Sequence, residues 1–273
     1  MTVRLRSAVL AVRVACREAA SGRRLIYIAM TTRNHARSIG LVLWKLRRVF
    51  AEFPREYHVL VADDGSTDDT WEALEAYQGA VPLSLVRHEG TVGLAQCTED
   101  LLREALARSD RPRRDCVITL PADFSASPAV VPELVRRFES GADLVVGESA
   151  MRDHPIGARL VRKTARFLLR PGVSIPGISD PVSGVCAIRL ITLSNSFRDH
   201  TDRLLTTAGW CAHAELLART ALRARQIAVL TLPPRPSGVA HDPAPSAVSL
   251  ALSLVRAGRR LRIPPPAAPV QRT

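Results

Sequence analysis

The chain has 273 residues, 47% of them hydrophobic and 23% charged, which is ordinary for a folded protein and enough for one large domain with appendages. Its formal net charge of +12 would suit a nucleic-acid partner, but the charge is unevenly distributed. Residues 1–24 and 243–273 each contribute +5, which leaves +2 for the 218 residues between them. Basic ends on a nearly neutral middle favour an anionic membrane surface as a partner, and we expect no nucleic acid.

The cysteines and the hydropathy pattern predict the compartment. Five scattered cysteines without a Cys-x-x-Cys pair exclude a disulfide framework and indicate a reducing environment. No stretch approaches the ~20 uninterrupted apolar residues that cross a bilayer. The N-terminus lacks the continuous apolar core of a secretory signal. We therefore expect a cytoplasmic protein, either free or peripheral on the membrane.

The first predicted element is a basic amphipathic helix within residues 1–24. Between residues 5 and 20, apolar residues recur at helical spacing on one side and arginines on another. This pattern is typical of a segment that lies in a membrane interface. It also fits a surface helix that packs its apolar stripe on the core, and both interpretations stay open.

Short apolar runs then alternate with helical patterns. Strands are predicted at residues 25–30, 57–62, 83–86, 116–120 and 143–146. Helices are predicted at about 38–50, 68–78, 93–108 and 129–139. Such alternation predicts an α/β fold with a mostly parallel sheet, in which ligands bind beyond the carboxyl ends of the strands.

The predicted domain spans residues 25–242, and a different pattern follows it in residues 243–273. A second basic amphipathic helix is predicted over 246–262, with the same two interpretations as the first. The Pro-rich remainder, from Ile263 onward, is expected to be extended or disordered.

The strongest chemical signal is Val59-Leu-Val-Ala-Asp-Asp-Gly-Ser-Thr-Asp68. An apolar strand ends in two adjacent carboxylates, turns on Gly65 and enters a capped helix. One carboxylate can accept from a nucleobase N–H, and the other can serve the ribose or a metal. An ordinary strand–helix turn capped by Asp would explain Asp63 or Asp64, but not the pair.

This segment resembles the signature of family 2 glycosyltransferases, and companion segments follow in order. They are Met30–Ile39, Glu89–Gly93 and Leu120–Ser125. The resemblance implies a GT-A fold, a Rossmann-like sheet that binds a nucleotide sugar. It also implies a donor-nucleotide site that comprises Thr31, Arg33, His35, Asp63 and Asp64.

A later segment, Ile178–Arg189, resembles the Asp-x-x-Ser-Gly region of polyprenyl-phosphate sugar transferases, the dolichyl-phosphate-mannose-synthase branch. Gly157-Ala-Arg159 opens a basic helix as that branch does. The resemblance implies that Arg159, Ser183 and Arg189 bind the acceptor. Asp180 is the catalytic candidate: a general base for an alcohol acceptor, or an orienting group for a phosphate acceptor.

Three departures from the family pattern change the expected chemistry. Pro121 replaces the first metal-binding Asp, so Asp123 alone is expected to hold Mg²⁺ or Mn²⁺, which is then weakly bound or dispensable. Thr31, Arg33 and His35 replace Pro, Tyr and Glu. The Phe-Arg that follows the Ser-Gly in the family is Val185-Cys186 here.

The resemblance implies an inverting hexosyltransferase that moves a sugar from a nucleotide-diphosphate sugar to a polyprenyl-phosphate-type acceptor at the cytoplasmic membrane face. Two alternatives stay open: a soluble small-molecule acceptor, as in natural-product assembly, or an inactive nucleotide-sugar binder. Trp210, His213 and Glu215 share one predicted helix and fit a core Trp beside a surface His. Glu215 also occupies the place of the family's helix acid near the acceptor.

Overall fold

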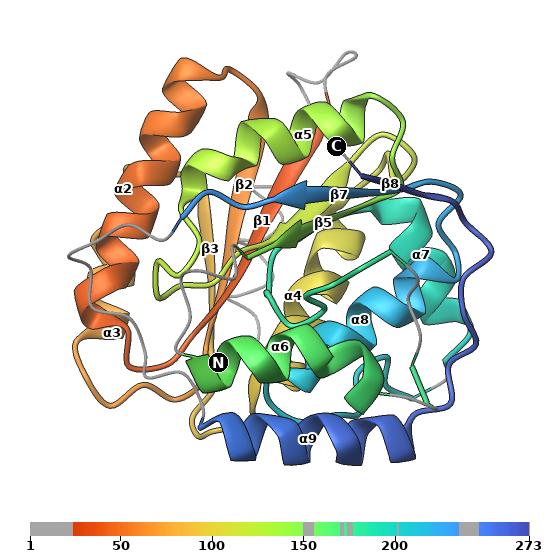
Figure 1. The fold of residues 1–273 in the computed structure, drawn as a ribbon. Helices are drawn as coiled ribbons and strands as arrows, with labels where there is room; N and C mark the ends of the chain where they lie inside the picture. Colours follow the sequence, from red (N-terminus) through yellow and green to blue (C-terminus); the bar gives the residue numbers. More distant parts are fainter. Residues whose placement is uncertain are drawn as a thin grey trace.

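The computed structural model describes residues 24–149, 156–169, 172–173, 177–200, 202–234 and 246–272. Within them, one eight-stranded sheet has the order β3-β2-β1-β4-β6-β5-β7-β8 (Figure 1). Only β6 runs antiparallel to its neighbours. The strands are β1 (Leu25–Thr32), β2 (Glu56–Asp63), β3 (Leu83–Arg87), β4 (Cys116–Thr119), β5 (Leu144–Glu148), β6 (Cys186–Arg189), β7 (Ile227–Thr231) and β8 (Val270–Arg272).

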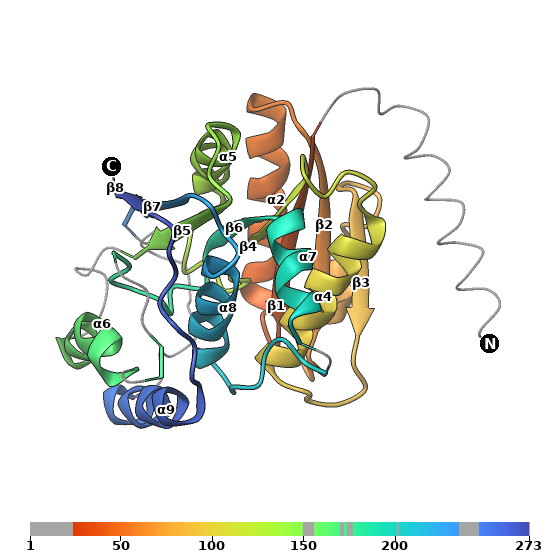
Figure 2. The ribbon, with the colours of Figure 1, turned by 90° about the vertical axis from the view of Figure 1, so that its right-hand side faces the viewer.

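Helices cover both faces of this sheet, and two more form an outer layer (Figures 1 and 2). One face is covered by α2 (Ala36–Glu52), α3 (Thr70–Glu75) and α5 (Val131–Glu139), the last after a 3₁₀ turn at Pro128–Val130. The other is covered by α4 (Leu94–Arg108), α7 (Leu190–Arg198) and α8 (Cys211–Ala221). The outer helices are α6 (Ile156–Leu168) and α9 (Ala247–Arg260).

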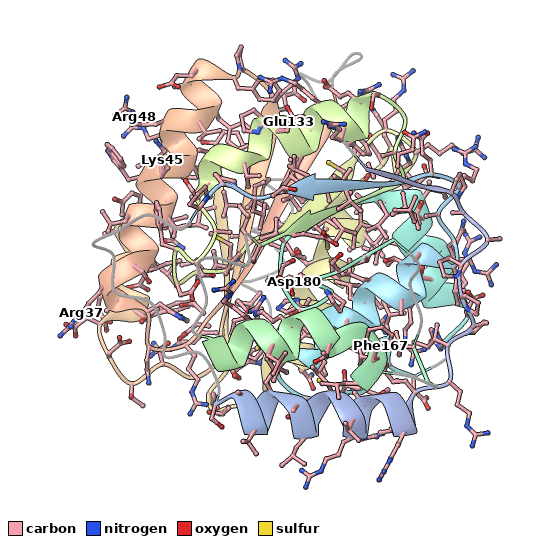
Figure 3. The ribbon with its side chains drawn as sticks, viewed as in Figure 1. Arg37, Lys45, Arg48, Glu133, Phe167 and Asp180 are labelled. Atoms are coloured by element: carbon pink, nitrogen blue, oxygen red, sulfur yellow. The ribbon has the colours of Figure 1, made fainter. Side chains whose placement is uncertain are left out.

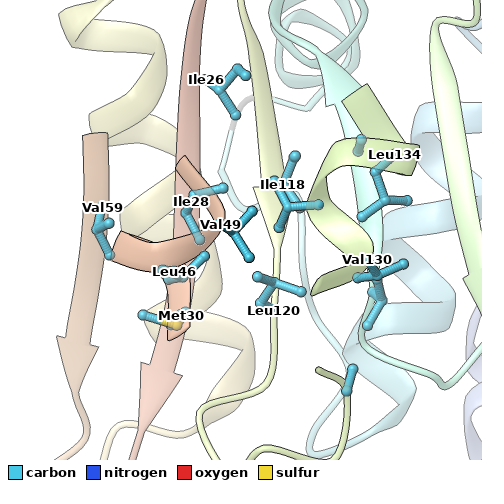
Figure 4. Packing of buried hydrophobic residues seen from close by; sticks show 14 of the residues in the cluster. Ile26, Ile28, Met30, Leu46, Val49, Val59, Ile118, Leu120, Val130 and Leu134 are labelled. Atoms are coloured by element: carbon cyan, nitrogen blue, oxygen red, sulfur yellow. The ribbon is translucent and has the colours of Figure 1, made fainter. Parts of the chain in front are cut away.

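Alternating side chains explain why β1 can be covered on both faces. Ile26, Ile28 and Met30 point to one face, and the residues between them point to the other. Leu46 of α2 packs on the first set because apolar residues recur along that helix at intervals of three and four (Figure 4). Full burial of each such side chain contributes roughly 1.5–3 kcal/mol to folding.

The predicted α/β fold with a mostly parallel sheet flanked by helices is confirmed. The five predicted strands correspond to β1–β5, and the four predicted helices to α2–α5. In the described part of the chain, no helix is both long enough and apolar enough to pass through a bilayer.

The C-terminal segment lies against the sheet domain. The helix predicted over 246–262 is present as α9, and Leu250 and Leu254 bury its apolar stripe. The tail beyond it ends as β8, which pairs with β7 in parallel. The predicted domain boundaries remain predictions, and the helix predicted at 5–20 lies outside the described residues.

Candidate functional site

The loops that follow β1 and β2 are joined by hydrogen bonds at the carboxyl edge of the sheet. Asn34 adopts a left-handed conformation (φ 56°), and its backbone N–H donates to Ser66 Oγ over 2.9 Å. In return, the Thr67 N–H donates to Asn34 Oδ1 over 2.8 Å. The His35 N–H donates to Thr70 Oγ1 over 2.8 Å. The two segments that carry the predicted nucleotide contacts therefore form one rigid unit.

Asp63 ends β2 with a fully buried carboxylate that is only half satisfied. Its Oδ1 accepts from the Ser66 hydroxyl and from the Ser66 N–H, the latter at 3.3 Å. Its Oδ2 is buried without a hydrogen-bond partner, and the Arg87 Nε lies 3.9 Å away. An unsatisfied buried carboxylate oxygen is costly, so Oδ2 is suited to accept from a ligand N–H. Ser66 and Arg87 also line an open pocket beside this carboxylate.

Asp64 has a different role in the structure. Its Oδ1 accepts from the backbone N–H groups of Val92 (2.6 Å) and Gly93 (3.0 Å), and its Oδ2 from Gly93 at 3.2 Å. The carboxylate thus holds the loop that enters α4, where Gly93 has a φ of 94°. The two adjacent carboxylates therefore differ in role. Asp63 has an acceptor oxygen without a hydrogen bond, and Asp64 fixes a loop.

Gly65 makes the turn between these carboxylates and α3, and we expect its replacement to be costly. Its φ is +67°, and an added Cβ would lie 2.9 Å from the carbonyl carbon of Gly90. Gly65→Ala should therefore lower the free energy of unfolding by about 2 kcal/mol, from left-handed strain and backbone overlap. Urea denaturation measures this loss.

Gly90→Ala is the matched control, because a Cβ there would meet nothing within 4 Å. Its free energy of unfolding should stay within about 0.5 kcal/mol of the wild type. Equal losses in the two variants would contradict the close contact between these loops.

A central cavity of about 180 Å³ opens at the same edge of the sheet. Thr31 and His35 line its donor side, together with Asp123. Its walls combine strand ends with α4, α8 and the segment before β6: Ala29, Thr31, His35, Leu94, Thr98, Leu101, Thr119, Leu120, Pro121, Ala122, Asp123, Ser183, Gly184, Trp210 and His213. The segments predicted to bind donor and acceptor therefore face one cavity.

Among the described residues that line this cavity, Asp123 is the only one with a carboxylate. It is 8% exposed, follows β4 and accepts from the Ser125 N–H at 2.9 Å. Between them, Phe124 adopts a φ of 60°. Across the described residues, no cluster of three or more His, Cys, Asp or Glu could hold a metal alone. The donor set thus fits a hard cation that takes one ligand from Asp123 and most others from a bound diphosphate.

Asp180 is buried in an ion pair with a residue that the sequence did not single out, Arg162 of α6. The Arg162 Nη1 donates to both carboxylate oxygens, over 3.0 and 2.8 Å. Arg162 is 4% exposed, and its guanidinium lies 5.5 Å from the centre of the Trp210 ring. Figure 3 shows Asp180 near the middle of the molecule, above α6 in this view, whereas the labelled cations of α2 point outward. The sequence does contain a signal for the burial of Arg162, because it lies on the same helical stripe as the apolar residues Ala165 and Leu169.

Three other titratable groups lie on this side of the molecule: Glu148, Glu215 and His213. The Glu148 Oε1 accepts from the backbone N–H groups of Ser179 and Asp180. Burial raises the pKa of Glu215, but hydrogen bonds from Arg219 and from residues 206 and 207 outweigh it, so the pKa lies below its ordinary value. Burial, followed by the charge of Arg162, lowers the pKa of His213 to about 4. His213, expected at the surface, is instead a neutral ring in the cavity wall.

Of the predicted site residues, only Thr31, His35, Asp123 and Ser183 line the cavity, and besides Asp63, Asp64 and Asp180, three others lie outside its lining. Arg189 ends β6, and because that strand is antiparallel, it lies opposite Cys116 at the start of β4, at the other edge of the sheet. There it donates to Asp143 Oδ1 over 2.7 Å. The side chains of Arg33 and Arg159 are exposed to solvent and do not line the cavity. We therefore leave Arg189 out of the acceptor site that we propose below.

Comparisons with known proteins agree with this geometry. The sequence model of a family described as Glycosyl transferase family 2 matches residues 27–190. A dolichol-phosphate mannosyltransferase of Pyrococcus furiosus is 28% identical over 139 residues, 49% of this chain and 38% of that one. A bactoprenol glucosyl transferase of Shigella phage SfV is 31% identical over 148 residues, 52% of this chain and 44% of that one. The chain thus spans less than half the length of these relatives.

Solved structures share the fold. Glucosyl-3-phosphoglycerate synthase from Mycobacterium tuberculosis, in complex with Mn²⁺, UDP and phosphoglyceric acid, superposes with a TM-score of 0.61 and 22% identity. The match covers 87% of this chain and 79% of that one. TarS of S. aureus in complex with UDP gives a TM-score of 0.52 at 18% identity, over 75% of this chain and 57% of that one.

Proposed function

This chain belongs to glycosyl transferase family 2, and from that premise we propose that it moves a sugar, with inversion, from a nucleoside-diphosphate sugar to a polyprenyl-phosphate-type acceptor. The names of the two curated relatives, dolichol-phosphate mannosyltransferase and bactoprenol glucosyl transferase, support a lipid-linked acceptor.

One observation carries the choice of acceptor: Asp180 and Glu215, the acids that the family resemblance places near the acceptor, are buried and already engaged. Asp180 is paired with Arg162, and Glu215 accepts from six donor groups. An alcohol acceptor needs a general base to take its proton, whereas a phosphate arrives ionised and needs a cation to hold it. In this proposal Arg162, oriented by Asp180, attracts the phosphate, and Ser183 lines its path.

The donor side holds the nucleotide and the leaving group. Asp63 Oδ2 accepts from a nucleobase N–H, while Thr31 and His35 line the wall along which the diphosphate lies. Asp123 would hold a divalent cation, Mg²⁺ or Mn²⁺, and that cation would supply positive charge beside the departing diphosphate. The acceptor oxygen then attacks the anomeric carbon from the side of Ser183 and His213, opposite the diphosphate.

The test compares acceptors that differ in one group. Purified protein is incubated with a panel of nucleotide sugars and one acceptor, which is a short-chain polyprenyl phosphate, the corresponding polyprenol or phosphoglycerate. Products are detected by mass spectrometry. Product from the phosphate but not from the alcohol is expected. Product from the alcohol, or from a soluble acceptor such as phosphoglycerate, would overturn the proposal in favour of small-molecule glycosylation. Donor binding without any turnover would indicate an inactive binder.

We expect Asp123 to control metal use. Asp123→Asn should lower the transfer rate on the order of 10²-fold, because the cation loses its protein ligand beside the leaving group. Pro121→Asp should raise the affinity for Mn²⁺, because it adds a second carboxylate to the cavity wall. Calorimetric titration of Mn²⁺ in the presence of nucleoside diphosphate measures the affinity.

Asp69→Asn, an exposed acid at the start of α3, is the control and should behave like the wild type. Full activity of chelator-treated protein, together with normal activity of Asp123→Asn, would show that the leaving group departs without a metal.

A further inference from the structure

The helices α6 and α9 form a two-helix layer on the outside of the molecule (Figures 1 and 2). Their contact is close because it uses small residues at both ends. A Cβ added to Gly157 would lie 3.2 Å from the Ala247 Cβ, and one added to Gly258 would lie 2.5 Å from the Leu169 carbonyl oxygen. Since amino end meets amino end and carboxyl end meets carboxyl end, the helices run parallel and act as one unit.

The inner side of the two-helix layer is buried against the rest of the protein. Leu169, Leu250 and Leu254 are buried, and they pack with Ala214 and Ala218 of α8 in one apolar cluster. The core therefore does not need any apolar side chain on the opposite side of either helix.

The outer side nevertheless carries large apolar side chains. Leu160, Val248 and Leu252 are 64%, 69% and 52% exposed, and together they define the outer patch. Val248 and Leu252 are four residues apart and so share one side of α9, opposite the buried stripe. Because Gly157 faces Ala247, Leu160 of α6 lies level with the turn of α9 between Val248 and Leu252. These three side chains therefore form one apolar surface rather than scattered exceptions.

Within α6 and α9, which carry the outer patch, all charged residues are basic. Four exposed arginines accompany the patch: Arg159, Arg256, Arg259 and Arg260. An apolar face flanked by arginines matches an anionic lipid surface, into which the apolar side chains insert while the guanidiniums contact headgroup phosphates. A second copy of the same face would instead oppose arginine to arginine.

We infer that the outer patch docks this protein on the anionic face of a lipid bilayer, with α6 and α9 lying in the plane of the headgroups. The two-helix layer is in direct contact with the acceptor side of the cavity. Arg162 of α6 donates to Asp180, and the buried cluster of α6 and α9 extends to α8, which carries His213. Docking would therefore bring this side near a lipid-borne phosphate. That consequence rests on the proposed function, whereas the docking itself does not.

The test is co-sedimentation of the full chain with vesicles of phosphatidylcholine, with and without phosphatidylglycerol, and containing no polyprenyl phosphate. The wild type should bind the anionic vesicles preferentially. Leu160→Ser/Val248→Ser/Leu252→Ser should bind them at least about 10-fold more weakly, because the inserted apolar groups are gone. Arg256→Gln/Arg259→Gln should also bind about 10-fold more weakly, and only where the lipid is anionic. Leu41→Ser is the matched control, a 48% exposed leucine on α2, and should bind normally.

Circular dichroism and nucleotide affinity establish that the triple variant is folded. Wild-type binding by that variant, or no preference of the wild type for anionic vesicles, would overturn the inference. A wild-type dimer that becomes monomeric in the triple variant, with no vesicle binding by either, would assign the patch to self-association instead. Because these vesicles lack the acceptor, vesicle binding without sugar transfer would count against the proposed function alone.

Discussion

Asp63→Asn should weaken the binding of nucleoside diphosphate on the order of 10²-fold, the scale of a lost hydrogen bond to a charged acceptor. The Oδ2 of Asp63 is buried and has no donor, and the amide would offer an N–H where an acceptor is needed. The same change removes a buried negative charge that is incompletely compensated, so the free energy of unfolding should stay unchanged or rise. Calorimetric titration and urea denaturation measure the two effects.

Asp115→Asn is the matched control at the opposite edge of the sheet. Asp115 is equally buried, but both of its oxygens are satisfied, by the Leu25 N–H at 3.0 Å and the Ser109 hydroxyl at 2.6 Å. This variant should lose about 1 kcal/mol of stability and bind nucleotide normally, the reverse of Asp63→Asn. If Asp63→Asn retains wild-type nucleotide affinity, the orphan oxygen is not the nucleobase contact.

Arg162→Met should abolish most transfer to a phosphate acceptor and also destabilise the fold. Removing the guanidinium leaves Asp180 buried without its partner, which costs about 3–5 kcal/mol of the free energy of unfolding. The double variant Arg162→Met/Asp180→Asn removes both charges and should recover most of that stability. Transfer should remain on the order of 10²-fold below the wild type in both variants, because the cation that holds the phosphate is missing.

The control is Arg189→Met, which breaks a second buried Arg–Asp pair away from the cavity. Its partner Asp143 keeps the Arg225 Nε at 3.2 Å, so the loss of stability should be smaller. Under conditions in which Arg189→Met is folded, its nucleotide affinity and its rate of transfer should match those of the wild type. Normal transfer by the double variant of Arg162 and Asp180 would show that the acceptor phosphate is bound elsewhere.

The sequence by itself determined five of the eight strands in the described residues, β1–β5, and the edge of the sheet that carries Asp63 and Asp64. Strand and helix periodicities are local, because side chains two, three or four residues apart already decide which face an element buries. Asp63 and Asp64 end an apolar strand before Gly65, so their position at the carboxyl edge of a parallel sheet followed from that run alone. The order of motifs along the chain was enough to predict the family.

Only the tertiary structure decided what each carboxylate does and which residues meet across the cavity. Asp63 and Asp64 look equivalent in the sequence, yet backbone N–H groups from another loop satisfy Asp64, whereas one oxygen of Asp63 has no hydrogen bond. Arg189 does not lie on the acceptor side as expected, because β6 runs antiparallel. A four-residue strand does not encode its own direction, so the sequence could not show this. Arg162 and Asp180 are 18 residues apart and meet because the apolar stripe of α6 must be buried, which carries the guanidinium inward with it. Burial and pairing depend on contacts distant in sequence, so local spacing could not predict them.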